Sequence, residues 1–168
     1  MKRQLRGTVA FAVCGSFCTL GAAVAQAEQL VRQGWELLPV MSYAASGLNT
    51  RFGRADEWKD RLEAPCTGTT LARLAAGLSD TPVTLAAKSL LRVGCPVLLA
   101  VSTNDGLGAS GENIARLMQR KHYYFVPYGQ DDAAQKPQSL KADLTLLPAA
   151  LEAALHGQQL QPVLREWN

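Results

Sequence analysis

The sequence predicts an α/β fold of three layers, in which helices cover both faces of a doubly wound, mainly parallel sheet. Short apolar runs of strand length alternate with longer segments whose apolar residues recur at helical spacing. Glycine, proline and small polar residues separate these runs, and no internal repeat or low-complexity linker divides the chain. The length of 168 residues and the hydrophobic content of 48% fit a single domain, residues 1–168, with its own core.

The first half of the chain is expected to contain two strands and two helices. Thr19 is a suitable N-cap for the first helix, and Gly34 follows its end. Pro39 favours an edge position for the second strand because proline has no N–H to donate to a neighbouring strand. The expected elements are a strand over residues 8–14, a helix over 19–32, a strand over 35–42 and a charged helix over 54–63.

The second half is expected to continue the alternation of helix and strand. Asp80 and Ser110 are candidate N-caps, and Gly94 and Gly157 are placed to end helices. The expected elements are helices over residues 69–78 and 81–91, a strand over 97–101, a helix over 112–120, a short last strand over 123–127 and a closing helix over 139–156.

The amino terminus allows two interpretations. Lys2, Arg3 and Arg6 precede an apolar stretch that ends in AVAQA just before Glu28, which is the outline of a secretory signal peptide. The alternative is that the same stretch is the first strand and helix of a cytoplasmic protein, because a turn at residues 15–16 interrupts it. Cleavage before Glu28 would remove the neighbour of the second strand, so we favour the cytoplasmic interpretation.

Charge and cysteine spacing argue against two classes of site. The formal net charge is only +3, and the basic residues are scattered, so we expect neither a nucleic-acid nor a membrane partner. The cysteines do not form CxxC pairs, and few histidines could join them, so we expect no metal site. The residues concerned are Cys14, Cys18, Cys66, Cys95, His122 and His156.

Three small, polar turns precede expected helices: residues 15–19 (GSFCT), 64–70 (APCTGTT) and 102–108 (STNDGLG). Glycine allows close approach of a ligand, hydroxyls donate hydrogen bonds, and helix N-termini attract anions such as phosphate. In open α/β sheets such turns gather outside the carboxyl ends of the strands. Together they predict a nucleotide or phosphate site, although each alone is also explained as a helix cap. The P-loop motif GxxxxGK[ST] is absent from the sequence.

At these turns the chain resembles the family of the B subunit of dipicolinate synthase, a flavoprotein-like member of the group of cysteine decarboxylases that bind flavin mononucleotide (FMN). The runs VAFAVCGSFCT, SYAASGLNTRFG and YYFVPYGQDDAAQKP carry the resemblance, which extends over nearly the whole chain. APCTGTT resembles the PASANT loop of the group, and STNDGLG resembles the segment whose asparagine, here Asn104, lies beside the flavin.

The resemblance implies a flavodoxin-like or Rossmann-like sheet with FMN as cofactor. It also implies oxidation of a dihydrodipicolinate-type precursor to dipicolinate, pyridine-2,6-dicarboxylate, during sporulation. The implied partner is the A subunit of dipicolinate synthase, which would supply the NAD(P) site, and a homo-oligomer or hetero-oligomer is expected.

The family pattern assigns residues of this chain to parts of the ligand site. Arg51 is the candidate for the dicarboxylate substrate because a guanidinium binds a carboxylate through two parallel hydrogen bonds, although a surface charge or an ion pair explains it equally. The implied FMN contacts are Gly15, Ser16 and Thr19 at the phosphate, Ser42 at the end of the second strand, Pro65, Thr67, Thr69 and Thr70 as a second wall, and Ser102, Thr103 and Asn104 beside the ring or the substrate.

Two departures from the family pattern stand out, and the first concerns a catalytic side chain. Phe17 stands where related decarboxylases have a catalytic histidine, and both histidines of this chain fall outside the three turns. Decarboxylation is therefore not predicted, and no catalytic residue is assigned. Cys18 at a helix start could have a lowered pKa, but without a general base nearby in the sequence we interpret it as structural.

The second and larger departure is a gap before the second turn. In the family a buried strand leads into this turn, whereas here residues 58–63 (WKDRLE) run directly into Ala64. We therefore predict an internal deletion that removes one central strand of the sheet. Either the remaining strands close together, or the crevice for the flavin is only partly built.

These observations leave three functions open. The chain could be a subunit of an oxidoreductase that forms dipicolinate, or another FMN-dependent enzyme that acts on a carboxylated substrate. The third possibility is a non-catalytic assembly subunit for the nicotinamide-binding A subunit. The intact polar turns favour a ligand site, whereas the gap before Ala64 favours the assembly role.

Overall fold

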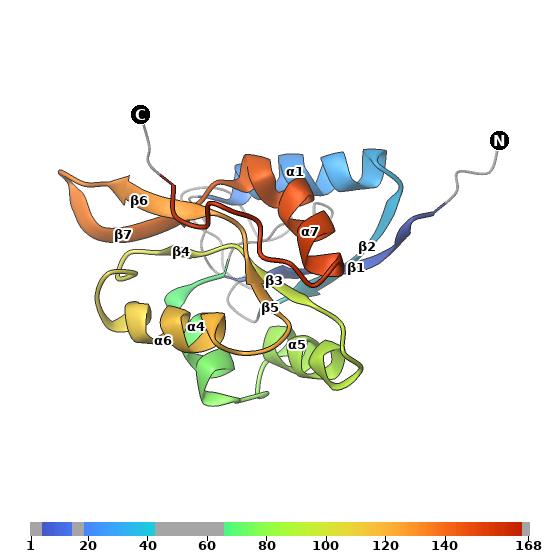
Figure 1. Cartoon of the computed structure of the whole chain (residues 1–168), viewed down its shortest axis with the longest axis horizontal. Coiled ribbons are helices and arrows are strands. Elements are labelled where there is room, and N and C mark those ends of the chain that lie inside the picture. The colour runs from blue at the N-terminus through green and yellow to red at the C-terminus, as the bar shows by residue number, and fades with distance from the viewer. Residues whose placement is uncertain (1–4, 15–18, 43–65, 166–168) are drawn as a thin grey trace.

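Two parallel strand pairs lie between two layers of helices (Figure 1). The computed structural model describes residues 5–14, 19–42 and 66–165. The pairs are β1 (Gly7–Val13) with β2 (Trp35–Met41), and β3 (Val97–Leu99) with β5 (Tyr123–Phe125). Helices α1 (Leu20–Arg32) and α7 (Leu147–Leu155) lie on one side, and α4 (Gly68–Ala76), α5 (Pro82–Arg92) and α6 (Ala109–Met118) lie on the other. This arrangement confirms the predicted doubly wound α/β fold.

The amino-terminal elements are integral to the core. The expected first strand, first helix and second strand are confirmed as β1, α1 and β2, with ends within one residue of the prediction. Phe11, Ala23, Ala27 and Leu30 are buried in one hydrophobic cluster with residues of the carboxyl-terminal half. Among the described residues, no helix is long and apolar enough to cross a membrane.

Helix ends in the middle of the chain differ from the prediction. Thr81, not Asp80, caps α5, because its hydroxyl accepts a hydrogen bond from the Thr84 N–H and forms a capping box. Asp80 instead accepts a hydrogen bond from Arg73 at 3.2 Å. Helix α6 begins before Ser110, so the Ser110 side chain is inside the helix and makes a tertiary contact rather than a cap.

The carboxyl-terminal quarter contains a hairpin that the sequence analysis missed. Strand β6 (Tyr128–Asp132) pairs antiparallel with β7 (Lys136–Ala142), so β5 is not the last strand. The predicted helix over residues 139–156 is wrong over residues 139–146. Helix α7 follows the short 3-10 helix η2 (Leu144–Leu146). Pro148 in the first turn of α7 prevents the helix from extending backwards, because proline lacks the N–H that an interior position needs.

The predicted strand over residues 97–101 is shorter and is followed by a second strand. Strand β3 ends at Leu99, and β4 (Ser102–Thr103) pairs antiparallel with β7. Among the described residues, the antiparallel strands form a sheet of their own, with the order β4-β7-β6. Two residues expected in a ligand turn, Ser102 and Thr103, thus lie in a strand held by the hairpin.

The two parallel pairs are not joined by a described strand. Within residues 5–14, 19–42 and 66–165, β1 pairs only with β2, and β3 pairs only with β5. An isolated parallel bridge from Cys66 to Val101 lies beyond the end of β3. The predicted loss of a central strand concerns residues before Cys66, which lie outside the described residues, so it stays a prediction. The helix expected over residues 54–63 lies outside the described residues.

Candidate functional site

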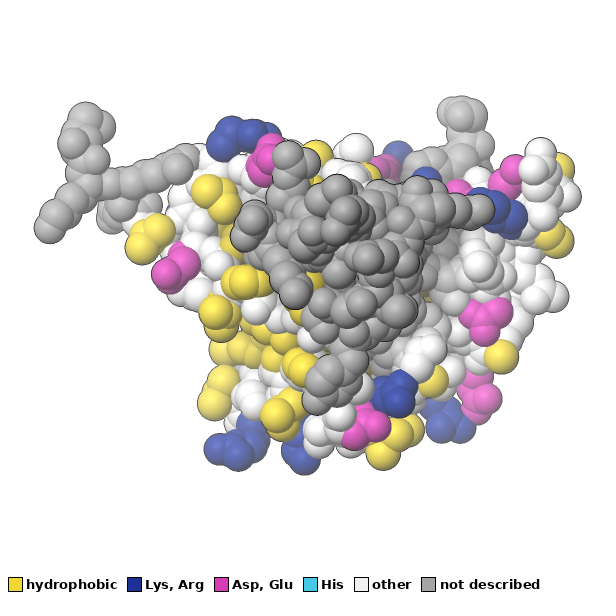
Figure 2. Space-filling model, turned by 180° about the vertical axis from the view of Figure 1, so that it is seen from behind, with side chains coloured by type: hydrophobic (Ala, Val, Ile, Leu, Met, Phe, Trp, Pro, Cys, Tyr) yellow, Lys and Arg dark blue, Asp and Glu magenta, His cyan; other side chains and the backbone are white. Residues whose placement is uncertain are grey.

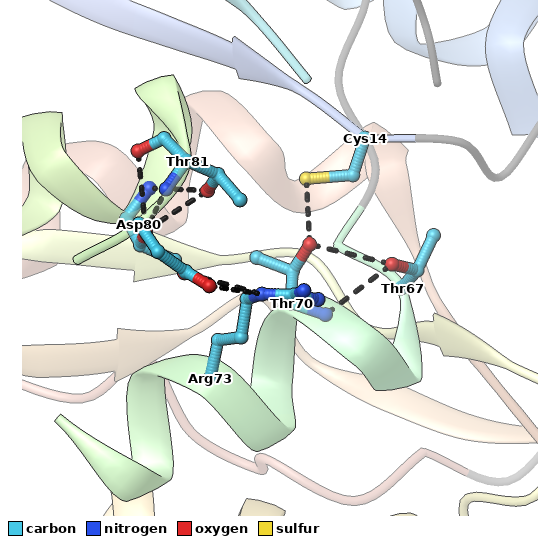
Figure 3. A network of polar contacts seen from close by, with 7 residues as sticks. Cys14, Thr67, Thr70, Arg73, Asp80 and Thr81 are labelled. Atoms are coloured by element: carbon cyan, nitrogen blue, oxygen red, sulfur yellow. Dashed lines mark hydrogen bonds and ion pairs between the residues drawn. The ribbon is translucent and has the colours of Figure 1, made fainter. Parts of the chain in front are cut away.

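The described parts of the three polar turns meet at one end of the parallel strands. The Thr19 hydroxyl donates to the Ser102 hydroxyl at 3.4 Å, which links the first turn to the third. The Thr70 hydroxyl donates to the Cys14 sulfur at 3.3 Å, which links the second turn to the end of β1 (Figure 3). The Cys66 N–H donates to the Ala100 carbonyl at 2.9 Å. The expectation that these turns converge is therefore supported by side-chain and backbone contacts.

Gly68 brings helix α4 directly against the third turn. A Cβ atom at Gly68 would lie 2.6 Å from the Ser110 Oγ, 2.9 Å from the Thr103 Oγ1 and 3.2 Å from the Asp105 Oδ1. Real Cβ atoms do not approach other heavy atoms so closely, so only glycine fits without a shift of the neighbours. The absence of a side chain at Gly68 therefore fixes the spacing between the second and third turns.

Asp105 is the acceptor at the centre of the third turn. The hydroxyls of Thr103 and Ser110 both donate to its Oδ1, the latter at 2.8 Å. These two hydrogen bonds, the one from Thr103 first, lower the pKa of the Asp105 carboxyl because they stabilise the charged form. The hairpin adds a further constraint, since the buried Ser139 hydroxyl donates to the Thr103 carbonyl at 3.2 Å.

The lowered pKa of Asp105 gives a testable pH dependence. A carboxyl whose pKa is lower in the folded state stabilises the fold above its unfolded pKa, near 3.8, and loses that contribution as the pH falls through the folded pKa. We expect the free energy of unfolding in urea to fall more steeply below about pH 4 in the wild type than in Asp105→Asn. Equal slopes in the two proteins would contradict this role of Asp105.

The N-terminus of α1 suits an anion. Thr19 occupies the N-cap position, but its hydroxyl makes no cap hydrogen bond and instead contacts Ser102. No acidic residue lies in the first turn of α1 or of α4 itself. The Asp105 carboxylate, however, lies beside Gly68 at the start of α4 and already faces the positive end of that helix dipole. A phosphate group fits the N-terminus of α1 better than that of α4, where the Thr67 side chain already accepts from the Thr70 N–H.

The remaining predicted contact residues divide into exposed and structural positions. Asn104 and Thr69 are exposed and make no hydrogen bond to the described residues, so both are available to a ligand. Ser42 is partly buried at the end of β2. Thr67 and Thr70 have structural roles as cap and buried donor, which was the alternative explanation for these turns. Gly15, Ser16, Arg51 and Pro65, together with positions 17 and 18, lie outside the described residues.

Two buried thiols lie behind this site. The contact with the Cys14 thiol and burial both raise the pKa of the Cys66 thiol, so Cys66 stays protonated at neutral pH. His122 lies before β5 and His156 at the end of α7, so neither reaches the three turns. In the described part of the chain, no three His, Cys, Asp or Glu side chains are grouped as a metal ion would require.

Sequence reasoning did not identify three of the residues that shape the site. Asp105, Ser110 and Ser139 were assigned to a turn, a cap and a helix, respectively, but they hold Thr103 in place. The spacing of Thr103 and Asp105, two residues apart, is a local signal that a side-chain hydrogen bond could have explained. The contributions of Ser110 and Ser139 depend on the actual start of α6 and on the hairpin.

The doubly wound sheet with polar turns at its strand ends defines a flavoprotein-type α/β protein, and the family model described as Flavoprotein matches residues 55–128. The B subunit of dipicolinate synthase from Bacillus subtilis (strain 168) is 39% identical over 186 aligned positions, which cover 94% of this chain and 93% of that protein. The chain belongs to the family of dipicolinate synthase B subunits. Because 186 positions exceed the 168 residues of this chain, the relative has residues that this chain lacks.

Solved structures agree with this assignment. The crystal structure of the B subunit of dipicolinate synthase from Bacillus halodurans C is 37% identical and superposes with a TM-score of 0.86, with 100% of both chains covered. The FMN-dependent cysteine decarboxylase SpaF shares the fold, with a TM-score of 0.59 at 23% identity, covering 90% of this chain and 98% of that chain.

Proposed function

We propose that this chain acts as the B subunit of dipicolinate synthase and takes part in the oxidation of a dihydrodipicolinate-type precursor to dipicolinate during sporulation. The proposed setting is the cytoplasm, with FMN as cofactor and an A-type subunit that supplies the NAD(P) site. The observation that carries the proposal is the convergence of the turns through Thr19 and Ser102 within a chain of this family.

The proposed FMN contacts combine the described geometry with the family pattern. The N-terminus of α1, together with Thr19, Gly15 and Ser16, would hold the phosphate, since the first N–H groups of α1 receive no cap from Thr19. Asn104 would donate or accept a hydrogen bond at the ring or the substrate from its exposed position. When bound, flavin supplies a two-electron acceptor for a substrate hydride. Arg51 would bind a substrate carboxylate.

The non-catalytic assembly role is the second candidate. It is favoured by the absence of a described strand between β1 and β3, at the centre of a sheet that would otherwise support the flavin crevice. In this case the chain would position the A subunit without binding a cofactor. An FMN-dependent reaction on another carboxylated substrate is the third candidate and shares the same site.

One experiment distinguishes the three candidates. Purified chain is titrated with FMN, followed by its visible absorption band, and then assayed for dipicolinate formation with and without an A-type subunit. Saturable flavin binding together with dipicolinate formation supports the proposal. A colourless chain that still raises the activity of the A subunit supports the assembly role. Flavin binding without any effect on dipicolinate formation supports the third candidate.

Replacement of Thr19 tests the proposed phosphate end of the site. Thr19→Val keeps the shape of the side chain but removes the hydroxyl, which lies at the α1 N-terminus. The hydroxyl proton, which is donated to Ser102 in the structure, would turn to the phosphate when FMN binds. A hydrogen bond to a charged group contributes about 1.5–3 kcal/mol, so FMN affinity should fall by about tenfold or more. Thr8→Val, at an exposed position of β1, is the matched control and should leave the affinity unchanged. Equal affinities in both variants would place the phosphate elsewhere.

Replacement of Asn104 tests the other end of the site. Asn104→Ala removes an exposed amide that has no structural partner among the described residues, so stability should be unchanged. If Asn104 lies beside the ring, the flavin absorption band and reduction potential should both shift, because hydrogen bonds near the ring tune its electronics. A variant with the spectrum and potential of the wild type would exclude this position for Asn104.

A further inference from the structure

Lys141 of β7 lies directly opposite Ser102 of β4. The antiparallel register pairs these two residues, and the Ala142 N–H beside them donates to the Val101 carbonyl at 2.7 Å. Hydrogen-bonded and non-hydrogen-bonded pairs alternate in an antiparallel ladder, so Ser102 and Lys141 form a non-hydrogen-bonded pair, in which side chains approach more closely. The Cβ atoms of two directly opposite residues are about 4.5–5.5 Å apart, and their side chains share one face of the sheet.

That face is the one on which the first and third polar turns meet. The Ser102 hydroxyl accepts from the Thr19 hydroxyl at the N-terminus of α1. The Lys141 side chain, which is 44% exposed, therefore begins next to the candidate ligand site. On the other side of Lys141 the register places Gly129 of β6, which has no side chain beyond its Cα. The row across the sheet is thus Ser102, Lys141 and Gly129, with room beside the lysine.

The neighbouring residue pair faces the opposite way. Leu140, opposite Thr103, is only 7% exposed, and a Cβ atom at Gly106 would lie 2.5 Å from the Leu140 Cγ. Successive residues of a strand point to opposite faces of the sheet. The burial of Leu140 therefore agrees with a Lys141 side chain that points away from the core and toward the site.

The Lys141 ammonium is only loosely paired in the structure. Its Nζ is 3.7 Å from the Asp131 Oδ1, whereas the Lys136 Nζ is 2.9 Å from the Asp131 Oδ2. The hydrogen bond from Lys136 is the largest cause of the lowered pKa of the Asp131 carboxyl, and Lys141 contributes less. Asp131 therefore keeps its main partner if Lys141 turns away. Because exposed ion pairs contribute little to stability, Lys141 can leave Asp131 at small cost.

The hairpin presents its charged groups to solvent. Figure 2 shows basic and acidic side chains close together at the end of the molecule that carries β6 and β7. A lysine side chain has a flexible stem of four carbons that ends in three donors. This stem lets the ammonium of Lys141 move from Asp131, on β6, to an anion beside Ser102, on β4.

The proposed substrate has two carboxylates, and Arg51 is a candidate for one of them. Burial of an unpaired carboxylate is unfavourable, so a dicarboxylate needs a cation at each end. We propose that Lys141 is the specificity-determining residue for the second carboxylate, which it binds next to Ser102. This inference rests on the proposed function, because it concerns the same site. The ligand carboxylate takes the place of Asp131 as the acceptor of the ammonium, in a charge-assisted hydrogen bond.

The test titrates the full chain, with and without FMN, with dipicolinate by isothermal titration calorimetry. Lys141→Gln keeps a long polar side chain but removes the charge, and it should weaken binding by about tenfold or more. Lys141→Arg keeps the charge and should restore most of the affinity. Lys136→Gln is the matched control, because it removes the closer partner of the same Asp131 at the far end of β7, and it should bind as the wild type does.

Pyridine-2-carboxylate, which has a single carboxylate, separates specificity from a general loss of affinity. The wild type should prefer dipicolinate, and this preference should fall by about tenfold in Lys141→Gln. The inference is overturned if the wild type does not bind dipicolinate saturably or if the two glutamine variants bind it alike. It is also overturned if Lys141→Gln loses affinity equally for both ligands.

Failure of this inference is distinguishable from failure of the proposed function. Dipicolinate formation with an A-type subunit, together with unchanged affinity in Lys141→Gln, would overturn the inference and support the proposed function. Binding that depends on Lys141, without dipicolinate formation, would support the inference and contradict the proposed function.

Discussion

Replacing Gly68 by alanine is expected to destabilise the protein by about 1–3 kcal/mol and to weaken FMN binding with it. The new Cβ would lie 2.6 Å from the Ser110 Oγ, so α4 and the third turn must move apart. The hydroxyls of Ser110 and Thr103 that this Cβ would meet both donate to Asp105, so displacing them would disturb both of these hydrogen bonds. Urea unfolding followed by circular dichroism measures the stability, and titration with FMN measures the affinity.

Gly21→Ala is the matched control for this substitution. Gly21 also lies in the first turn of a helix, but a Cβ there meets no atom of the described residues within 4 Å. Alanine is the better helix former, so this variant should be as stable as the wild type or more stable by up to about 1 kcal/mol. If Gly68→Ala were as stable as Gly21→Ala, the close approach of α4 to the third turn would not be what positions the site.

Removal of residues 1–27 is expected to abolish cooperative folding. The shortened chain loses β1, which is the only described partner of β2, and it loses the buried side chains of Phe11, Ala23 and Ala27. The backbone groups of β2 would be left unpaired, and a cavity would open on the buried side of the sheet. The free-energy cost of these two changes together would exceed the free energy of unfolding of a typical domain. Far-ultraviolet circular dichroism and a thermal melt should show no cooperative transition.

A chain that lacks only residues 2–4 is the control, because β1 begins at Gly7. It should melt as the wild type does. A shortened chain that starts at Glu28 and still folds cooperatively would contradict the structural role of β1. Such a result would restore the signal-peptide interpretation of Lys2, Arg3 and Arg6, because cleavage would then leave a functional domain.

Local pattern was sufficient to predict the amino-terminal unit. The run TVAFAV predicted a strand, which is confirmed as β1, and the helical spacing that follows predicted a helix, which is confirmed as α1. Both predictions succeeded because the apolar residues that set the pattern in the sequence are also the residues that the fold buries. The polar sequence of the β6–β7 hairpin concealed it, since its turn has no Asn-Gly or Asp-Gly pair. Asp132 stabilises that turn by accepting from the N–H groups of Ala134 and Gln135, which composition alone does not reveal.

The site was predictable as a set of turns but not as a network. Glycine and hydroxyl residues before helices identified the three turns, and the contact of Thr19 with Ser102 supports their convergence. The central role of Asp105 was missed, because its partner Ser110 is five residues away and was assigned to a helix cap. Long-range contacts such as that from Ser139 depend on how the hairpin packs, which no local pattern encodes.

The division of the sheet has a consequence for the order of folding. Each parallel pair is built from residues close in sequence, β1-α1-β2 within residues 7–41 and β3-α6-β5 within 97–125, so each can form by short loop closures. Among the described residues no strand belongs to both pairs, and packing through α5, and through α7 against α1, joins them. Native-state hydrogen exchange should therefore resolve two cooperative units, with the β1-β2 unit opening at a free energy different from that of the β3-β5 unit.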